Sequence, residues 1–352
     1  MPDPAPRSTT HAGTAVIVAD APAIPGLTFR HLAGPRDYAV IARLRAACTL
    51  EDVGDELVTE GDIANFLEHP IDTDPYRDLI LAEVGEAMVA MHWSTLRLVD
   101  GLYVSGLRGY VHPAWRHRGL GRALLAYGER HGRTAVPAGA IGVPGAWQTM
   151  ATSLEPGAQA LYQGSGYSPF RYAFTMVRDL GAPIPALELP AGLELRPAHP
   201  EHYRAIWEAE REAFQDHWGY TPWPEENFQR FLAFPHYNPA LWRVAWDGDQ
   251  VAGMVLSYIN AEENAAFGRL RGYTEDIAIR RPWRRKGLAS ALLADSLRTL
   301  QERGLHEASL GVDAENPNEA LRLYEQLGFR TTITWTTFRR TWPGPPPEVT
   351  AP

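Results

Sequence analysis

A segment that occurs twice limits what this chain can fold into more than any other feature. The first copy is Val111-His-Pro-Ala-Trp-Arg-His-Arg-Gly-Leu-Gly-Arg-Ala-Leu-Leu125, and the second is Ile279-Arg-Arg-Pro-Trp-Arg-Arg-Lys-Gly-Leu-Ala-Ser-Ala-Leu-Leu293. Each copy runs from a β-branched residue through a basic turn into a helix rich in Ala and Leu. The pair Leu161-Tyr162 matches Leu323-Tyr324 at nearly the same spacing. Because this period is far longer than that of a solenoid repeat, it indicates a duplicated domain.

The length of the chain agrees with two domains. Its 352 residues suit two domains of ordinary size, and we expect them over 26–180 and 192–342. Residues 181–191 are the expected linker, because their prolines and glycine oppose a continuous helix or central strand. The two ends, 1–25 and 343–352, are expected to be flexible tails, and the first lacks the pattern of a signal peptide.

The second half shows the order of elements most clearly. Strands are expected at 193–196, at 241–259 as a hairpin around Asp247-Gly248-Asp249, and at 275–279, 308–312 and 331–339. Helices are expected at 202–214, 287–303 and 318–327, where apolar residues follow a helical period. Strands and helices therefore share each half, which indicates an α/β protein.

The composition argues against several classes of protein. The formal net charge of −9 disfavours a general nucleic-acid binder, and no run approaches the roughly 18 apolar residues that span a bilayer. Cys48 is the only cysteine, so no internal disulfide can form and a cytoplasmic location is expected. No His, Cys, Asp and Glu group has the spacing of a metal site, so no metal is expected.

The two basic turns have the chemistry of a small-anion site. Backbone N–H groups at a helix start have no intrahelical acceptor, and the helix dipole adds partial positive charge there. Gly119 and Gly287 permit close approach of a ligand because they carry no Cβ. The flanking side chains Arg116, His117, Arg118, Arg284, Arg285 and Lys286 add charge. The alternative is a solvated basic helix start with glycine for packing.

These residues also resemble a known family. Arg116-x-x-Gly119-x-Gly121 and Arg284-x-x-Gly287-x-Ala289 are similar to the acyl-CoA pyrophosphate loop of the GCN5-related N-acetyltransferases. Asn316-Pro-Asn-Glu-Ala-Leu-Arg-Leu-Tyr324-Glu-Gln-Leu-Gly-Phe329 resembles the closing helix of that family, and 158–167 occupies the same place in the first half. The resemblance covers nearly the whole chain except the tails and linker, whereas Rossmann and P-loop patterns are absent.

The resemblance implies two tandem domains, each with a mixed, splayed central β-sheet flanked by helices. It also implies acetyl-CoA as the co-substrate, with the pantetheine arm beside the strand that precedes each turn. The residues implied in acetyl-CoA binding are Ile277, Ile279, Arg284, Arg285, Lys286, Gly287, Leu288 and Ala289, with Val111, Arg116, His117, Arg118, Gly119, Leu120 and Gly121 as first-half counterparts.

Three residues of the second half are candidates for the chemistry. The resemblance implies Tyr324 as the acid that protonates the departing sulfur, and Asn316 as a ligand of the pantetheine amide. Glu275 is the candidate base, with Asp276 as an alternative. Tyr324 could instead pack its helix, Asn316 could cap it, and Glu275 could be a solvated edge carboxylate. The first half retains Tyr162 but has no asparagine matching Asn316.

The segment 214–224 is expected to contribute to the acceptor site. It holds a dense group of aromatic residues with one acid and one histidine. Asp216 could hold a cationic amine, Trp218 and Tyr220 could offer it a π face, and His217 could carry a proton near neutral pH. The alternative is an aromatic loop that packs over the core.

The sequence therefore predicts an N-acetyltransferase that moves an acetyl group from acetyl-CoA to a primary amine of a small molecule, with the second domain as the catalyst. A non-catalytic acyl-CoA-binding regulator, acetylation of a protein or peptide amine, and a structural duplication with one inactive half are the alternatives. The oligomeric state and the acceptor are open.

Overall fold

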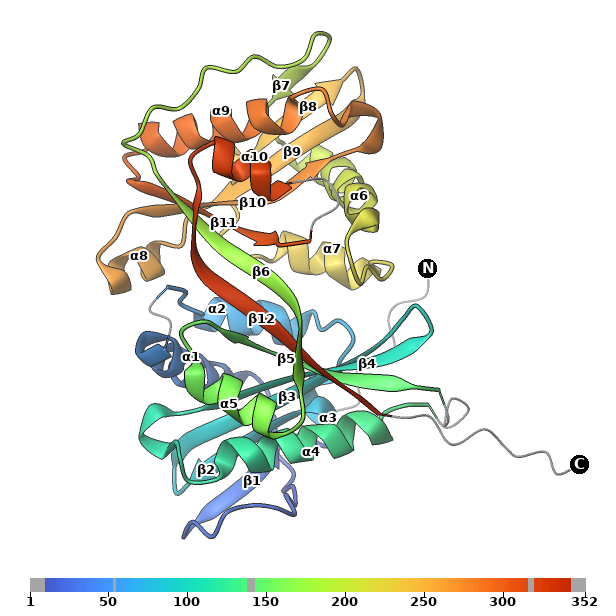
Figure 1. The fold of residues 1–352 in the computed structure, drawn as a ribbon, viewed down its shortest axis with the longest axis vertical. Helices are drawn as coiled ribbons and strands as arrows, with labels where there is room; N and C mark the ends of the chain where they lie inside the picture. The colour runs from blue at the N-terminus through green and yellow to red at the C-terminus, as the bar shows by residue number, and fades with distance from the viewer. Residues whose placement is uncertain (1–9, 53–54, 138–142, 316–319, 343–352) are drawn as a thin grey trace, which may run out of the picture. The chain divides into compact units, whose positions relative to one another are not determined.

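The computed structural model describes residues 10–52, 55–137, 143–315 and 320–342. The chain forms two compact units: Met1–Phe170 with Thr337–Pro352, and Arg171–Thr336. We call them unit 1 and unit 2. Both are α/β, as the sequence predicts, and each combines one sheet with helices on its two faces (Figure 1). Within the described residues, none of the helices has the length and apolar character needed to cross a membrane.

Unit 1 begins with a strand and two helices and continues as a mixed sheet. Its elements are β1 (Leu27–His31), α1 (Tyr38–Asp52), α2 (Glu60–Glu68), α3 (Pro75–Asp78), β2 (Leu79–Val84), β3 (Ala87–Val99), β4 (Leu102–Val111), α4 (Leu120–Thr134), β5 (Gly145–Thr152) and α5 (Pro156–Gly164). The strand order is β1-β2-β3-β4-β5, in which β4 and β5 are parallel. Helices α1 and α2 pack on one face of the sheet and α4 on the other, because apolar residues alternate between two clusters along β2 and β3.

Unit 2 repeats this plan. Its elements are β7 (Glu194–Arg196), α6 (Tyr203–Ala213), α7 (Glu225–Leu232), β8 (Arg243–Asp247), β9 (Gln250–Tyr258), α8 (Ala261–Phe267), β10 (Arg271–Ile279), α9 (Leu288–Glu302), β11 (Glu307–Asp313) and α10 (Ala320–Gln326). The strand order is β11-β10-β9-β8-β7. Along β9, Val251, Met254 and Leu256 face the cluster under α6 and α7, whereas Ala252 and Val255 face the cluster under α9. The elements expected from the sequence are present, and α7 and α8 are additional.

Two long strands run from one unit into the other. Strand β6 (Ser168–Asp179) starts in unit 1, and its residues 173–179 pair antiparallel with β11 of unit 2. Strand β12 (Arg330–Trp342) starts in unit 2 and ends beside β5 of unit 1. There Phe338 and Trp342 pack against Leu107 and Trp147. Strand β6 is the last strand of the first repeat but packs in unit 2, and β12 is the last strand of the second repeat but ends in unit 1. The expected domain boundaries at 180 and 192 did not include this exchange of strands.

The N-terminal segment differs from the flexible tail that we expected for residues 1–25. Val16 N–H donates to Phe29 O over 2.8 Å, and His31 N–H donates to Thr14 O over 2.9 Å. Val18 is buried at 6% exposure and packs near Ile80 and Leu124. Apolar residues spaced two apart let the segment lie on β1 as an extended strap, so the Ala and Pro content of this region did not make it mobile. We call residues 13–25 the strap.

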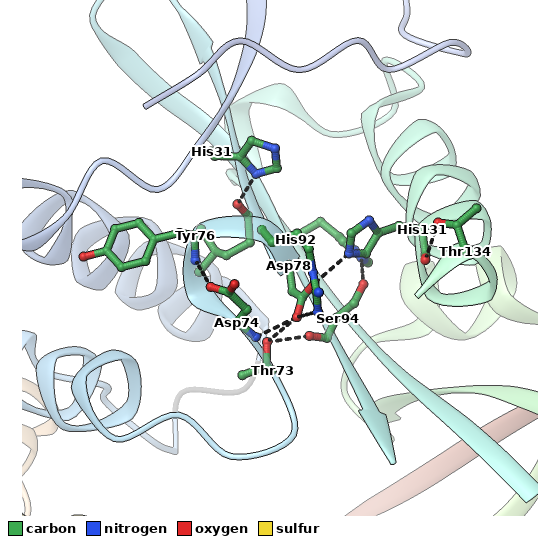
Figure 2. A network of polar contacts seen from close by, with 11 residues as sticks. His31, Thr73, Asp74, Tyr76, Asp78, His92, Ser94, His131 and Thr134 are labelled. Carbon is green, nitrogen blue, oxygen red and sulfur yellow. Dashed lines mark hydrogen bonds and ion pairs between the residues drawn. The ribbon is translucent and has the colours of Figure 1, made fainter. Parts of the chain in front are cut away.

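A buried polar network joins α3, β3 and α4 of unit 1 (Figure 2). Asp78 accepts a hydrogen bond of 2.8 Å from His131 Nε2, and Thr73 Oγ1 donates to Ser94 O over 2.8 Å. His92 Nε2 lies 2.9 Å from Ser94 Oγ, and burial lowers the pKa of His92 to about 3, so its ring is neutral. The network supplies partners for buried polar groups and is structural.

Phe338→Ala tests the contribution of β12 to unit 1. Phe338 is 1% exposed, so its truncation leaves a cavity in the core of unit 1 and should lower stability by about 3–5 kcal/mol. The control Thr341→Ala alters an exposed side chain of the same strand and should change stability by less than about 0.5 kcal/mol. Denaturant unfolding with hydrogen exchange at β5 and α5 is the measurement. Equal stability of the two variants would contradict the strand assignment.

Candidate active site

The second basic turn presents backbone amides to solvent. After β10 ends at Ile279, a short 3-10 helix over Arg281–Trp283 leads into α9, whose N-cap residue Gly287 has φ of 82°. No side chain caps this helix, and a Cβ added to Gly287 would meet nothing within 4 Å. Arg285 also has a positive φ, of 62°. Such a turn gathers N–H groups at a helix start, where they favour an anion.

The first basic turn has the same backbone but different surroundings. His117 has φ of 59° and Gly119 has φ of 92°, which match Arg285 and Gly287. A Cβ added to Gly119, however, would lie 3.3 Å from Pro22 Cβ of the strap. The strap therefore lies against the first turn, whereas the second turn is open at the corresponding position.

An arginine anchors each turn to the end of the helix that follows the first strand. Arg284 Nε donates to Ile279 O over 2.9 Å, and Arg284 Nη2 donates to Ala213 O over 3.0 Å. Its Nη1 lies 2.6 Å from a carboxylate oxygen of Asp216. We call this arrangement the clasp of unit 2.

Unit 1 contains the matching clasp. Arg116 Nε donates to Val111 O over 3.1 Å, and its two terminal nitrogens lie 2.5 and 2.6 Å from the Asp52 carboxylate. Arg116 and Arg284 were expected to add side-chain charge to the turns. Both guanidinium groups are bonded to protein atoms in this structure.

Some of the other residues expected to bind acetyl-CoA have exposed side chains, and the rest are buried or partly buried. Lys286 Nζ donates to Pro282 O over 2.9 Å, as Arg118 Nη2 donates to Ala114 O over 3.2 Å. Both side chains, like those of Arg285 and His117, are exposed at the rim of their turns. Leu288 and Leu120 are the buried first residues of their helices, and Ala289, Gly121, Ile277, Ile279 and Val111 are partly buried.

Asp216 is not the open carboxylate that we expected for a cationic amine. Its oxygens lie 2.5 Å from Arg281 Nη2 and 2.6 Å from Arg284 Nη1. Hydrogen bonds from these two arginines lower the pKa of Asp216 below its usual range. Two cations already compensate its charge, so we reassign Asp216 to the clasp.

The other three acceptor candidates remain on one loop. Trp218 is 41% exposed, and the guanidinium carbon of Arg171 lies 4.7 Å from its ring centroid. Arg171 also pairs with Asp313 at the end of β11 over 2.7 Å, which brings the loop toward that end of the sheet. His217 lies against Phe214, with 4.2 Å between ring centroids, and burial lowers its pKa, so it is neutral at pH 7. Tyr220 is half-buried.

The central strands of each unit separate, as predicted. Parallel pairing of β10 with β11 is confined to Arg271–Tyr273 and Glu307–Ser309, and that of β4 with β5 to Tyr103–Gly106 and Gly145–Gln148. Beyond these pairs the facing strand edges of each unit diverge. Main-chain hydrogen-bonding groups along 274–279 are therefore not used by β11 and can serve an extended ligand.

Glu275 lies where β10 and β11 separate, and its charge acts on Tyr324. Glu275 Oε1 accepts a hydrogen bond of 3.1 Å from the Gly311 N–H of β11. Tyr324 of α10 is buried, and both burial and the charge of Glu275 raise the pKa of its phenol. The phenol is therefore protonated at neutral pH and can act as a proton donor. Asn316 lies outside the described residues.

A β-bulge distinguishes β10 from its counterpart β4. Glu275 pairs with Leu256 and Ala278 with Met254, so Asp276 and Ile277 stand opposite a single residue of β9. Asp276 adopts φ of 46°, a conformation that costs a residue other than glycine about 1–3 kcal/mol. The β3–β4 ladder runs from Ala90↔Val111 to Val99↔Leu102 without such a shift.

Sequence reasoning missed two residues that hold this bulge. Tyr237 Oη donates to Asp276 Oδ2 over 2.5 Å, and the carboxyl of Glu210 on α6 is hydrogen-bonded to that of Asp276. A signal for Glu210 was present, because it falls on the apolar face of α6 with Ile206, Trp207 and Ala213, where a carboxylate has no place unless it is paired.

The first half lacks the corresponding acids. The repeat aligns Arg108 with Asp276 and Leu107 with Glu275. Tyr162, the match to Tyr324, is buried and hydrogen-bonded to the Thr149 side chain. Across the described parts of both units, no three His, Cys, Asp or Glu side chains are grouped as a metal ion requires.

Comparison with known proteins agrees with this geometry. The acetyltransferase (GNAT) family matches residues 203–329, which span α6 to the end of α10. A mycothiol acetyltransferase from Thermobispora bispora is 33% identical over 231 residues, which are 65% of this chain and 74% of the relative. A GCN5-related N-acetyltransferase from Sphaerobacter thermophilus has a similar structure, with a TM-score of 0.64, 29% identity, and coverage of 91% of this chain and 98% of that one.

A second solved structure has the same layout. It is a tandem GNAT protein from the clavulanic acid biosynthesis pathway, with a TM-score of 0.64, 18% identity, and coverage of 90% of this chain and 98% of that one. At this level of identity the likeness concerns the fold alone.

Asp216→Asn tests the clasp of unit 2. Loss of the carboxylate charge weakens two ion pairs, so amide hydrogen exchange over 280–288 should quicken. Because the arginines lower the pKa of Asp216, the difference from the parent should be constant from about pH 5 to pH 8. The matched control Asp52→Asn should quicken exchange over 112–120 instead. Unchanged exchange in both variants would show that the clasps do not hold the turns.

Proposed function

This chain belongs to the acetyltransferase (GNAT) family and is an acyl-CoA-dependent N-acetyltransferase, and from this premise we propose that it transfers an acetyl group from acetyl-CoA to a primary amine of a small molecule. The observation that carries the proposal is the separation of β10 from β11. In one unit, this separation is accompanied by a free strand edge, an open turn at a helix start, and the side chains of Glu275 and Tyr324.

The donor is held mainly by main chain in this proposal. The amides at the start of α9 receive the pyrophosphate, and the exposed charges of Arg285 and Lys286 add attraction at the rim. The pantetheine arm lies along β10, where Ile277 and Ile279 offer main-chain groups. Bound acetyl-CoA supplies the thioester whose acetyl group is transferred.

The chemistry needs a neutral amine and a protonated leaving group. An alkyl amine has a pKa near 10.4, so it must lose a proton before it attacks. In the proposed reaction Glu275 takes that proton, the amine nitrogen bonds to the thioester carbonyl carbon, and the C–S bond breaks. Tyr324 then gives its proton to the sulfur and recovers one from solvent. Backbone N–H groups at the bulge can stabilise the carbonyl oxygen as it gains charge.

The acceptor site is proposed between the end of β11 and the loop that carries His217, Trp218 and Tyr220. The partly exposed Trp218 ring offers an apolar surface beside the separated strands. The relative from T. bispora is named a mycothiol acetyltransferase, which supports a small-molecule acceptor.

Unit 2 is the proposed catalyst, and four features of unit 1 support this choice. The strap lies against Gly119, and Tyr162 is hydrogen-bonded to Thr149. Strand β4 has no bulge in its ladder with β3, and it carries Arg108 where β10 carries Asp276. Unit 1 then supports unit 2 without turnover of its own.

Tyr324→Phe separates an enzyme from an acyl-CoA-binding regulator. The phenylalanine retains the packing of α10 but cannot donate a proton, so the rate of thiol release with acetyl-CoA and a panel of primary amines should fall about 100-fold or more. Calorimetric affinity for acetyl-CoA should stay within about twofold of the parent. The control Tyr162→Phe should retain the parental rate. A Tyr324→Phe enzyme that turns over as fast as the parent would remove Tyr324 from the mechanism.

Gly287→Ala and Gly119→Ala test which turn binds the donor. Both glycines have positive φ, so each substitution strains the backbone by about 1–2 kcal/mol. Gly287→Ala also places a Cβ where the pyrophosphate approaches, and it should weaken acetyl-CoA binding about tenfold or more. Gly119→Ala should leave the calorimetric affinity unchanged. The reverse result would assign the donor to unit 1.

A further inference from the structure

The β-bulge in β10 is held by side chains, because its backbone conformation is unfavourable. Asp276, the first of the two residues that oppose one residue of β9, has φ of 46° and is not glycine. Its side chain accepts a hydrogen bond of 2.5 Å from Tyr237 and a second hydrogen bond from Glu210. Tyr237 lies in the loop after α7 and Glu210 lies on α6. Two other parts of unit 2 therefore hold this one strained residue of β10.

Glu210 can make its bond only as a donor. Its side chain is 5% exposed, and Asp276 already accepts from Tyr237, so the two carboxyl groups must share a proton to lie side by side. The second oxygen of Glu210 is buried and has no hydrogen-bond partner. Burial and the neighbouring carboxylate raise the pKa of Glu210 well above its usual value, in agreement with a proton shared by the pair.

Among the described residues, no cation acts on this pair. The ionisable side chains that act on it are Tyr237 and, beyond Tyr237, Tyr258 of β9. The other charges of α6 point elsewhere: Glu212 pairs with Arg280 over 2.8 Å, and Arg211 lies over the ring of Trp207. Trp207, Phe231 and Trp242 make the remaining environment apolar.

We propose that Glu210 is a positioning residue for the acetyltransferase reaction: its shared proton holds Asp276, and with it the bulge backbone at Asp276 and Ile277, in the conformation that the reacting thioester requires. The inference rests on the proposed function of unit 2. Asp276 is adjacent to Glu275, so a displaced bulge also moves the proposed base. In unit 1 the β3–β4 ladder is unbroken, and Arg108 stands at the position that corresponds to Asp276.

The arrangement predicts a loss of activity on the alkaline side. Below the raised pKa of the pair, one proton joins the two carboxyl groups. As pH rises through that pKa, Glu210 loses the proton and two negative charges stand together in an apolar environment. Their repulsion displaces Asp276, so kcat falls while the turn at Gly287, which binds the donor, is unaffected.

Glu210→Gln and Glu210→Leu test this role in the full chain. Glutamine donates the same hydrogen bond without an ionisable proton, so the variant should lose the alkaline fall in kcat that the pair causes. Leucine fills the space but donates nothing, so it should lower kcat about tenfold or more with KM for acetyl-CoA within about twofold. The control Glu212→Gln, on the exposed side of the helix, should retain the parental pH profile.

A second readout does not depend on turnover. Infrared difference spectra should show a protonated carboxylic acid at pH 7 that Glu210→Gln removes and Glu212→Gln retains. Parental kcat and pH profile in Glu210→Leu, or no protonated acid assigned to Glu210, would overturn the inference. Absence of thiol release from the parent protein with every amine would instead contradict the proposed function, and the infrared result would still decide whether Glu210 holds the proton.

Discussion

The short parallel ladder between β10 and β11 is the constraint on which the site depends. Because the two strands pair only over Arg271–Tyr273 and Glu307–Ser309, the rest of β10 keeps a free edge inside a folded sheet. A free edge in the interior is costly unless something uses its hydrogen-bonding groups. The Glu275 carboxylate uses one amide of β11, and an extended amide-bearing ligand is suited to the others. The short pairing of β10 with β11 therefore shapes the sheet and also leaves the main-chain groups to which such a ligand is suited.

The two units show what the duplication kept and what it changed. Each retains the same turn backbone and the same arginine clasp, with Asp52 in unit 1 and Asp216 in unit 2. The residues with which α4 and α9 contact their sheets differ between the two units. In unit 1 the large ring of His92 lies against Gly128, where a Cβ would be only 2.3 Å away. In unit 2, Ser296 takes the place of Gly128 and is hydrogen-bonded to Ser257 of β9 over 2.6 Å. Such compensation keeps the scaffold while the sites diverge.

The sequence predicted the parts of this structure that local patterns determine. The two turns, the helices that follow them and the hairpin at Asp247-Gly248-Asp249 were expected, because turn residues and hydrophobic periodicity are local signals. The separation of the central strands was implied by the family resemblance alone. Their place in the acetyltransferase family followed from the same motifs.

The features that the sequence did not predict depend on contacts between distant segments. The partners of Asp216 lie more than sixty positions away, so nothing near it revealed that its charge was already compensated. The residue pattern of β6 and β12 is that of a strand whichever strand they pair with. Periodicity therefore could not predict that the two strands are exchanged between the units. Glu210 did leave a trace, as an acid on an apolar helix face, but its partner Asp276 lies on another element.

Hydrogen exchange of the full chain with and without acetyl-CoA tests the central claim most directly, because it reports on both turns in one experiment. The account predicts that acetyl-CoA slows amide exchange along 274–279 and over the start of α9 after Gly287, and leaves the start of α4 after Gly119 unchanged. Protection confined to α4 and its turn, with none at β10 or α9, would contradict it.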